Sequence, residues 1–313
     1  FIVSDWGSIA EMTNHGFAKD NKQAAEIAIN AGSDMDMESY AYLNHLVELV
    51  KENKVKIELI DEAVKRILRV KFELGLFENP YKYCDLEREK NTVGKKEFHD
   101  EVLEMAKKSI VLLKNENNLL PLKKEGLKIA LIGPLANDKT SPLGSWRIAA
   151  DDETAVSVLE GMSNYKGNTL QFAKGIQLTN GRTEFMWETK INTSKTDGID
   201  EAIALAKKVD VVVMVLGEHG FQSGEGRSRT ELGLPGLQQT LLEKVYAVNS
   251  NIVLVLQNGR PLVIPWAAKN IPCIVEAWHL GTESGNAIAQ VLYGDYNPSG
   301  KLPMTFPRNE GQL

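Results

Sequence analysis

Two acidic residues of this chain stand where a side chain could do chemistry, and the first is Asp5. It follows the apolar residues 1–3 and Ser4, and it precedes Trp6 and Gly7. A short apolar run that ends in a polar residue and a glycine is typical of the C-terminal end of a buried parallel strand. In barrel enzymes that end carries the catalytic groups, so Asp5 is placed as a catalytic carboxylate would be. An aspartate that only caps a turn has the same pattern, and both interpretations stay open here.

The second acidic residue, Glu225, lies in the most polar loop of the chain, at residues 217–230 after an apolar run at 209–216. Gly224 and Gly226 leave Glu225 sterically open on both sides. A loop of this length at the C-terminal end of a strand is a usual place for function. Two arginines, Arg227 and Arg229, are close enough in sequence to hold Glu225 in place. A solvated surface loop with incidental ion pairs is the alternative.

Taken together, the two loops suggest a reaction. Asp5 and Glu225 lie far apart in the sequence, on different predicted domains. Two carboxylates that face one cleft from separate domains suit glycoside hydrolysis, in which one attacks the anomeric carbon. The other protonates the leaving oxygen and then activates water. Separate environments also allow the two carboxyl groups to differ in protonation, as these roles require.

The composition describes an ordinary globular protein and disfavours several classes of function. The 313 residues are 43% hydrophobic and 25% charged, and the net charge of −6 argues against nucleic acid as the main partner. Two cysteines cannot build a disulfide framework, and the five histidines show no metal-ligand spacing, so we expect neither a metal nor a cofactor. Gly133 and Gly217 end apolar runs, but neither completes a dinucleotide-binding G-x-G-x-x-G motif. No apolar run approaches the length of a membrane span.

The first 77 residues contain too few strands to close a sheet. The pattern predicts strands at 1–7 and 33–37, and helices at 21–31, 40–52 and 58–74. Two parallel strands alone would leave their edges unpaired, which folded proteins avoid. Residues 1–77 are therefore predicted to be the last part of a (β/α)8 barrel. Residues 78–122 are predicted to form a linker and a helix, at about 95–113, that leads into the second domain.

Residues 123–313 are predicted to form an α/β sandwich domain. Continuous Val/Ile/Leu runs alternate with helix-length segments, which is typical of a mostly parallel sheet covered on both faces. The expected strands are 128–132, 209–216, 251–256 and 272–277, and the expected helices are 155–162, 198–207, 237–248 and 283–293.

Several motifs resemble glycoside hydrolase family 3, the family of many β-glucosidases, and especially its bacterial periplasmic type. The resemblance covers essentially the whole chain. The motifs are Ser4-Asp5-Trp6-Gly7, Ala31-Gly32-Ser33-Asp34-Met35-Asp36-Met37, Leu74-Gly75-Leu76-Phe77, Ser109-Ile110-Val111-Leu112-Leu113-Lys114-Asn115, Leu119-Leu120-Pro121-Leu122, Ser223-Gly224-Glu225-Gly226-Arg227-Ser228-Arg229, Asn258-Gly259-Arg260-Pro261 and Gly294-Asp295-Tyr296-Asn297-Pro298-Ser299-Gly300-Lys301-Leu302-Pro303.

The resemblance implies roles for individual residues in a retaining mechanism. Asp5 would be the nucleophile and Glu225 the general acid/base. Trp6 would offer an aromatic face to the sugar, with a core tryptophan as the alternative, and Met37 would line the nucleophile's pocket, with plain core packing as the alternative. Arg229 would orient the Glu225 loop. The turn at residues 144–146 would approach the cleft.

The expected substrates are β-linked glucosides or oligosaccharides, and the family implies a periplasmic or secreted protein, although the sequence itself names no compartment. A β-xylosidase or an N-acetylglucosaminidase of the same family are alternatives. The N-acetylglucosaminidase branch uses a barrel Asp–His pair as acid/base, so Glu225 favours the glucosidase branch. From another class, a non-catalytic carbohydrate-binding module remains open.

The family's barrel starts some hundreds of residues before Asp5, and that earlier portion grips the sugar. We therefore expect this chain alone to be nearly or wholly inactive, because catalysis needs the sugar held in a near-attack geometry. Residues 1–77 are expected to be disordered, rebuilt, or exchanged between two chains in a homodimer.

Overall fold

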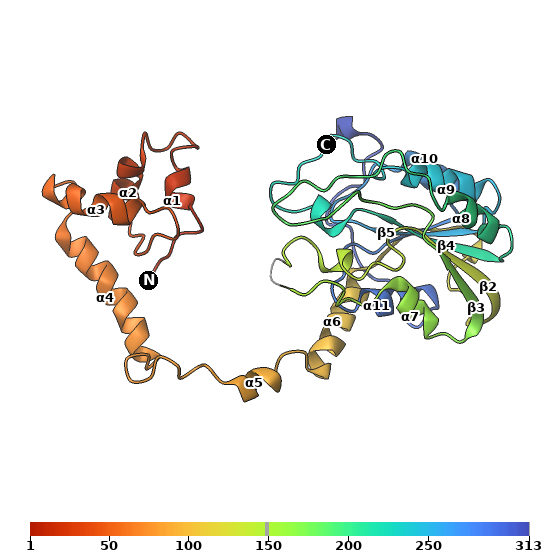
Figure 1. Ribbon diagram of the computed structural model, residues 1–313, viewed down its shortest axis with the longest axis horizontal. Coiled ribbons are helices and arrows are strands. Elements are labelled where there is room, and N and C mark those ends of the chain that lie inside the picture. Colours follow the sequence, from red (N-terminus) through yellow and green to blue (C-terminus); the bar gives the residue numbers. More distant parts are fainter. Residues whose placement is uncertain (148–149, 313) are drawn as a thin grey trace. The chain divides into compact units, whose positions relative to one another are not determined.

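The computed structural model describes residues 1–147 and 150–312. The chain folds into two compact units, a first unit, Phe1–Val93, and a second unit, Gly94–Leu313 (Figure 1). Each unit has its own hydrophobic core.

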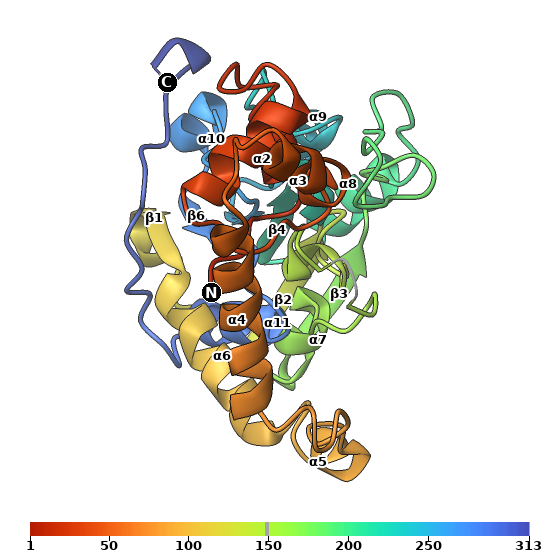
Figure 2. The ribbon, with the colours of Figure 1, turned by 90° about the vertical axis from the view of Figure 1, so that its left-hand side faces the viewer.

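The first unit is helical. Its helices are α1 (Ser8–Glu11), α2 (Asn21–Asn30), α3 (Ala41–Lys51), α4 (Ile57–Glu73) and α5 (Leu86–Lys90). The Asp20 side chain begins α2 by accepting a hydrogen bond from the Gln23 amide at 2.8 Å, which satisfies a free amide of the first turn. Small residues of α2, among them Ala24 and Ala25, let α3 pack closely beside it around the buried Leu49 (Figure 2).

The two strands predicted in the first unit are present only as a single parallel bridge between Val3 and Met35. The direction agrees with the prediction, but the predicted strand lengths are wrong. A pair of strands without neighbours lacks the further ladder bonds that would extend it. The apolar residues of this segment remain exposed, including Phe1 (52%) and Ile2 (61%).

The second unit is built on a six-stranded sheet in the order β1-β6-β5-β4-β2-β3. The edge strand β1 is antiparallel to β6, and every other pair is parallel. The strands are β1 (Val111–Asn115), β2 (Glu125–Ile132), β3 (Gly167–Ala173), β4 (Val211–Gly217), β5 (Ile252–Gln257) and β6 (Cys273–Glu276). Mixed α/β architecture with a mostly parallel sheet is therefore confirmed.

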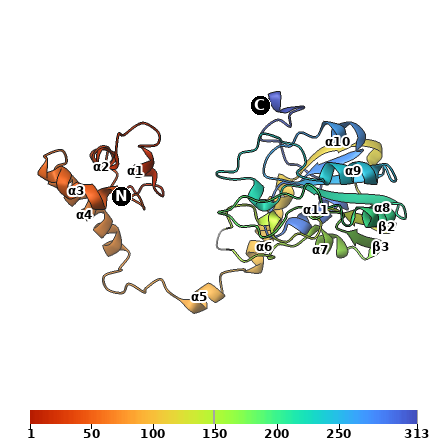
Figure 3. The same ribbon diagram turned by 45° about the horizontal axis from the view of Figure 1, so that its top comes forward.

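Helices cover both faces of this sheet (Figures 1 and 3). On one face lie α6 (Lys96–Ser109), α7 (Val158–Ser163) and α11 (Ser284–Leu292), and on the other lie α8 (Ile199–Ala206), α9 (Gln238–Tyr246) and α10 (Pro265–Asn270). Short 3-10 turns occur at Glu116–Asn118, Ser141–Leu143, Gly220–Gln222 and Glu310–Gln312. Successive side chains of β4 point to opposite faces. One core contains Val211, Val213 and Val215, and the other contains Val212, Met214 and Leu216.

The predicted helix at 95–113 is too long. Helix α6 ends at Ser109, and Val111–Asn115 forms β1 instead. The apolar run at residues 110–113 suits a helix or a strand equally, and antiparallel pairing with β6 decides between them. Two elements of the second unit were not predicted from the sequence: β3, whose alternate residues are exposed, and the short α10.

Candidate active site

Asp5 lies at the end of the bridged segment of the first unit, just before α1. Its carboxylate accepts a hydrogen bond from the Trp6 amide at 2.7 Å, and the residue is exposed. The Trp6 side chain is 68% exposed, so it is not part of the core of this unit.

Met37 lies beside the Asp5 segment. Its amide donates to the Ser4 hydroxyl at 2.9 Å, and its carbonyl accepts from the Gly7 amide at 2.8 Å. These two bonds bring Asp5, Trp6 and Met37 to one region of the first unit. The Met37 side chain lines a shallow pocket of about 620 Å³ together with Met35, Tyr40 and Leu43 among others.

Glu225 lies in the loop that leaves β4 at the carboxyl end of the sheet. Gly217 makes the exit sharp: its φ is +143°, and a Cβ there would stand 1.9 Å from the Gln257 carbonyl oxygen. Gly224, with φ +116°, is packed so closely that a Cβ would lie 2.2 Å from the Ser145 hydroxyl. The Glu225 side chain is exposed, and within the described residues its carboxylate makes no hydrogen bond or ion pair.

The turn at residues 144–146 therefore contacts the Glu225 loop from within the same unit. Trp146, the last residue of this turn, is 66% exposed, and its ring centroid lies 5.8 Å from that of Phe185. Phe185 in turn accepts a hydrogen bond at its carbonyl from Arg227 of the loop. An exposed aromatic surface thus borders the loop that carries Glu225.

Arg229 does not bond Glu225. It donates instead to Glu218 at 2.5 Å and to the Gly233 carbonyl at 3.1 Å. Glu218 is fully buried and also pairs with Arg260, whose Nε lies 3.1 Å from Oε1. No role was predicted from the sequence for Glu218 or Arg260. A charged residue directly after a continuous apolar strand was the available signal for Glu218.

A second buried acid, Glu276, lies at the end of β6. It accepts hydrogen bonds from the Trp278 amide at 2.8 Å and from the Asn258 side chain at 3.1 Å. Burial raises the pKa of Glu276 to about 8, the two hydrogen bonds lower it, and the nearby charge of Glu218 adds to the rise. His219, next in sequence to Glu218, has its pKa lowered, again chiefly by burial. Glu276 and His219 are therefore neutral near pH 7.

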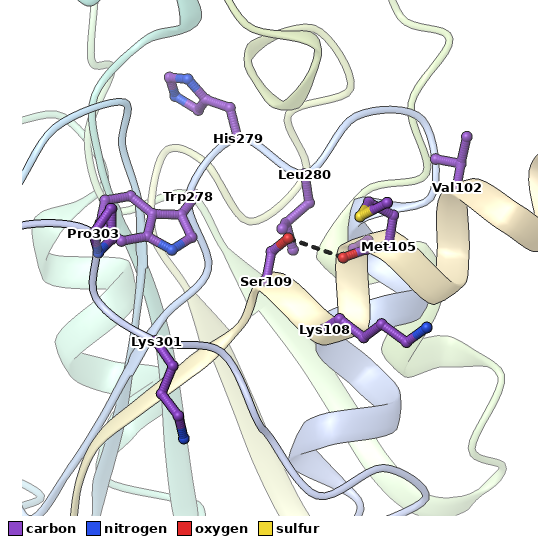
Figure 4. A pocket seen from close by; sticks show the side chains of 10 residues that line it. Val102, Met105, Lys108, Ser109, Trp278, His279, Leu280, Lys301 and Pro303 are labelled. Atoms are coloured by element: carbon purple, nitrogen blue, oxygen red, sulfur yellow. Dashed lines mark hydrogen bonds between the residues drawn. The ribbon is translucent and has the colours of Figure 1, made fainter.

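A pocket of about 600 Å³ lies between α6, residues 278–280 and residues 301–303 (Figure 4). Figure 4 shows Trp278, Met105 and Leu280 on its wall, with the Ser109 hydroxyl donating to the Met105 carbonyl at 2.9 Å. Its charged lining residues are lysines, and no carboxylate lines it. This pocket lacks the acid pair that glycoside hydrolysis needs, and neither Asp5 nor Glu225 lines it.

In residues 1–147 and 150–312, no three His, Cys, Asp or Glu side chains are grouped so as to hold a metal ion. None of the helices in the described part of the chain combines the length and apolar character needed to cross a membrane.

Comparison with known families decides the membership of this chain. Residues 1–70 match the glycosyl hydrolase family 3 N terminal domain, and residues 110–313 match the glycosyl hydrolase family 3 C-terminal domain. The chain belongs to glycosyl hydrolase family 3. The resemblance read from the motifs is thereby confirmed.

Relatives of this family 3 chain include glucosidases and xylosidases. A periplasmic beta-glucosidase from Salmonella typhimurium is 41% identical over 99% of this chain and 42% of its own length. A beta-xylosidase from Formosa agariphila is 37% identical over 100% of this chain and 43% of its own. Among solved structures, a Listeria innocua beta-glucosidase in complex with isofagomine aligns with a TM-score of 0.87 and 35% identity, over 99% of this chain and 41% of that one. The family 3 chain thus spans about two fifths of the length of these relatives.

Proposed function

We propose that the protein containing this chain is a retaining β-glycosidase that hydrolyses terminal β-D-glucosyl residues by double displacement. The observation that carries the proposal is the 41% identity with a periplasmic beta-glucosidase over 99% of the chain. The positions of the two carboxylates support it. Asp5 follows the bridged segment of the first unit, and Glu225 lies in an open glycine-flanked loop after β4.

In the proposed reaction, an Asp5 carboxylate oxygen attacks the anomeric carbon while Glu225 gives its proton to the leaving glycosidic oxygen. The C–O bond to the aglycone breaks, and a glycosyl ester on Asp5 forms. Glu225, now ionised, takes a proton from water, and that water attacks the anomeric carbon and releases Asp5. Two inversions at one carbon retain the β configuration.

Three further residues take supporting roles in this proposal. The exposed ring of Trp6, next to Asp5, offers a face on which a sugar can stack. Met37 forms an apolar wall near the nucleophile. Arg229 orients the Glu225 loop through Glu218, since that is its ion-pair partner.

We also propose that residues 1–77 are the end of a (β/α)8 barrel, followed by a linker and leading helix at 78–122 and the α/β sandwich at 123–313. The parallel bridge between Val3 and Met35 supports this, because neighbouring barrel strands run parallel.

A β-xylosidase is the second candidate, favoured by the 37% identity with a Formosa agariphila beta-xylosidase. The two candidates differ in whether the sugar carries a hydroxymethyl group. The ratio of kcat/KM for p-nitrophenyl β-glucoside and β-xyloside, measured on the full-length protein, decides between them.

The test of the mechanism uses azide with the full-length protein and an activated aryl glucoside. In Asp5→Gly, azide replaces the nucleophile and is expected to give the α-glucosyl azide. In Glu225→Ala, the glycosyl ester still forms, and azide is expected to give the β-glucosyl azide. Glu231→Ala, which removes an exposed carboxylate of the second unit, serves as the control and should keep wild-type turnover. Unchanged hydrolysis in both variants would refute the roles given to Asp5 and Glu225. Sugar binding without turnover, unaffected by Asp5→Ala, would instead indicate a non-catalytic carbohydrate-binding module.

A further inference from the structure

We propose that Glu218 and Arg260 form a positioning pair that fixes the Glu225 loop, so that proton donation by Glu225 depends on them. The inference rests on the proposed function, because it assigns the pair to the general-acid step. Neither residue is proposed to touch the substrate. Both lie in the second unit, and all the contacts that support the inference lie within that unit.

Glu218 is the buried acceptor that holds the neighbouring arginines in place. Its side chain is fully buried, and it lies between two arginines, Arg229 at 2.5 Å and Arg260 at 3.1 Å. The Gly259 amide adds a third donor at 3.2 Å. A buried carboxylate held by several charged donors keeps them in one geometry, because releasing any of them leaves charge unpaired in a dry site.

Arg260 connects the buried Glu218 to the backbone of the Glu225 loop. Its guanidinium donates to the carbonyl of Gln222 and, at 2.8 Å, to the carbonyl of Arg227. These carbonyls lie on either side of Glu225, three residues before it and two residues after it. One guanidinium therefore joins both ends of the short segment that carries the proposed acid. A planar group with several donors can do this, whereas a single ammonium cannot bond all three acceptors in the same directions.

Close packing completes the support at one end of the loop. A Cβ on Gly259 would lie 1.9 Å from the Ser223 hydroxyl, so the turn that carries Arg260 touches the start of the segment. The Glu225 side chain itself makes no polar contact within the described structure, so backbone contacts determine its position. The flanking glycines add conformational freedom, which these contacts remove.

The test compares two substrates in the full-length protein. With 2,4-dinitrophenyl β-glucoside, the leaving group departs without a proton, whereas phenyl β-glucoside needs the general acid. For Arg260→Lys and Glu218→Gln, we expect kcat/KM for the phenyl substrate to fall by about 10²-fold and formation of the glycosyl ester from the dinitrophenyl substrate to stay within about threefold. The ratio of the two rates does not depend on the fraction of folded protein, so partial unfolding cannot imitate the result.

Glu225→Ala is the reference for a lost general acid, and Arg308→Lys, at an exposed arginine of the same unit, is the matched control. If Glu225→Ala discriminates between the substrates but Arg260→Lys and Glu218→Gln lower both rates equally or not at all, the positioning pair is refuted alone. If Glu225→Ala itself fails to discriminate, the proposed function falls, and this inference falls with it.

Discussion

Replacing the buried acid Glu276 by glutamine tests the electrostatics of the second unit most directly. The pKa of Glu276 is about 8 in the folded protein, against an ordinary value of 4.5. Between these values the folded state holds a proton that the unfolded state has lost. The free energy of unfolding therefore falls as pH rises, by about 1.4 kcal/mol per pH unit. Because the pKa is raised in the folded state, the stabilisation that protonated Glu276 contributes to folding is fully present below pH 4.5 and is lost as pH rises through 8.

Summed from pH 5 to pH 8, this single group should lower the free energy of unfolding by about 3–4 kcal/mol. Glutamine cannot ionise, so Glu276→Gln should lose that part of the pH dependence and keep the rest. The neutral amide preserves the shape of the protonated acid and its hydrogen bond from the Trp278 amide.

The assay is urea unfolding of wild type and Glu276→Gln at pH 5, 6, 7 and 8. Tryptophan fluorescence reports chiefly on the second unit, since only Trp6 lies in the first. Glu231→Gln removes an exposed carboxylate of the same unit and controls for the change of charge. Curves of free energy against pH that run parallel for wild type and Glu276→Gln would refute the reasoning, because they would mean that Glu276 ionises alike in both states.

Two further predictions concern the sheet. Gly217→Ala places a Cβ 1.9 Å from the Gln257 carbonyl oxygen at φ +143° and should cost more than about 3 kcal/mol, whereas Gly126→Ala, at φ +81° with open space, should cost about 1 kcal/mol. Equal losses of urea stability in these two variants would contradict the close approach. Leu254→Ala leaves a cavity at a fully buried position and should lower the free energy of unfolding by about 2–5 kcal/mol. Leu86→Ala, at a position that is 82% exposed, should lower it by less than about 0.5 kcal/mol. Thermal melting measures both, and similar melting points for the two variants would contradict the prediction.

The central strands of the second unit were predictable because they are buried on both faces. Runs such as Val211–Gly217 have apolar side chains at nearly every position, and few other structures present that pattern. β3 was not predicted because it is an edge strand in which three of the seven residues are exposed. The run at residues 110–113 was misjudged because its state depends on pairing with β6, a strand far along the chain. Local sequence does not contain that information.

The same distinction between local sequence and distant contacts applies to the candidate active site. Asp5 and Glu225 could be proposed because each lies in a short motif whose neighbours are local in sequence. Glu218 and Arg260 could not, since their partnership joins the loop after β4 to the loop after β5. Arg229 was expected to act on the Glu225 loop, and the structure identifies the partner, Glu218, through which we propose that it does so.

The alternation of β4 between two cores has a consequence for how this chain can change in length. Val211, Val213 and Val215 fill one core, and Val212, Met214 and Leu216 fill the other. Inserting or deleting one residue at the start of the strand would exchange these two sets between the two faces of the sheet. It would also move Gly217 away from the Gln257 carbonyl oxygen, where a Cβ would lie only 1.9 Å away. A substitution in this strand changes the volume of one side chain, whereas a change of length moves every later side chain of the strand to the other face, so we expect insertions and deletions to be tolerated in the surrounding loops and not in β4.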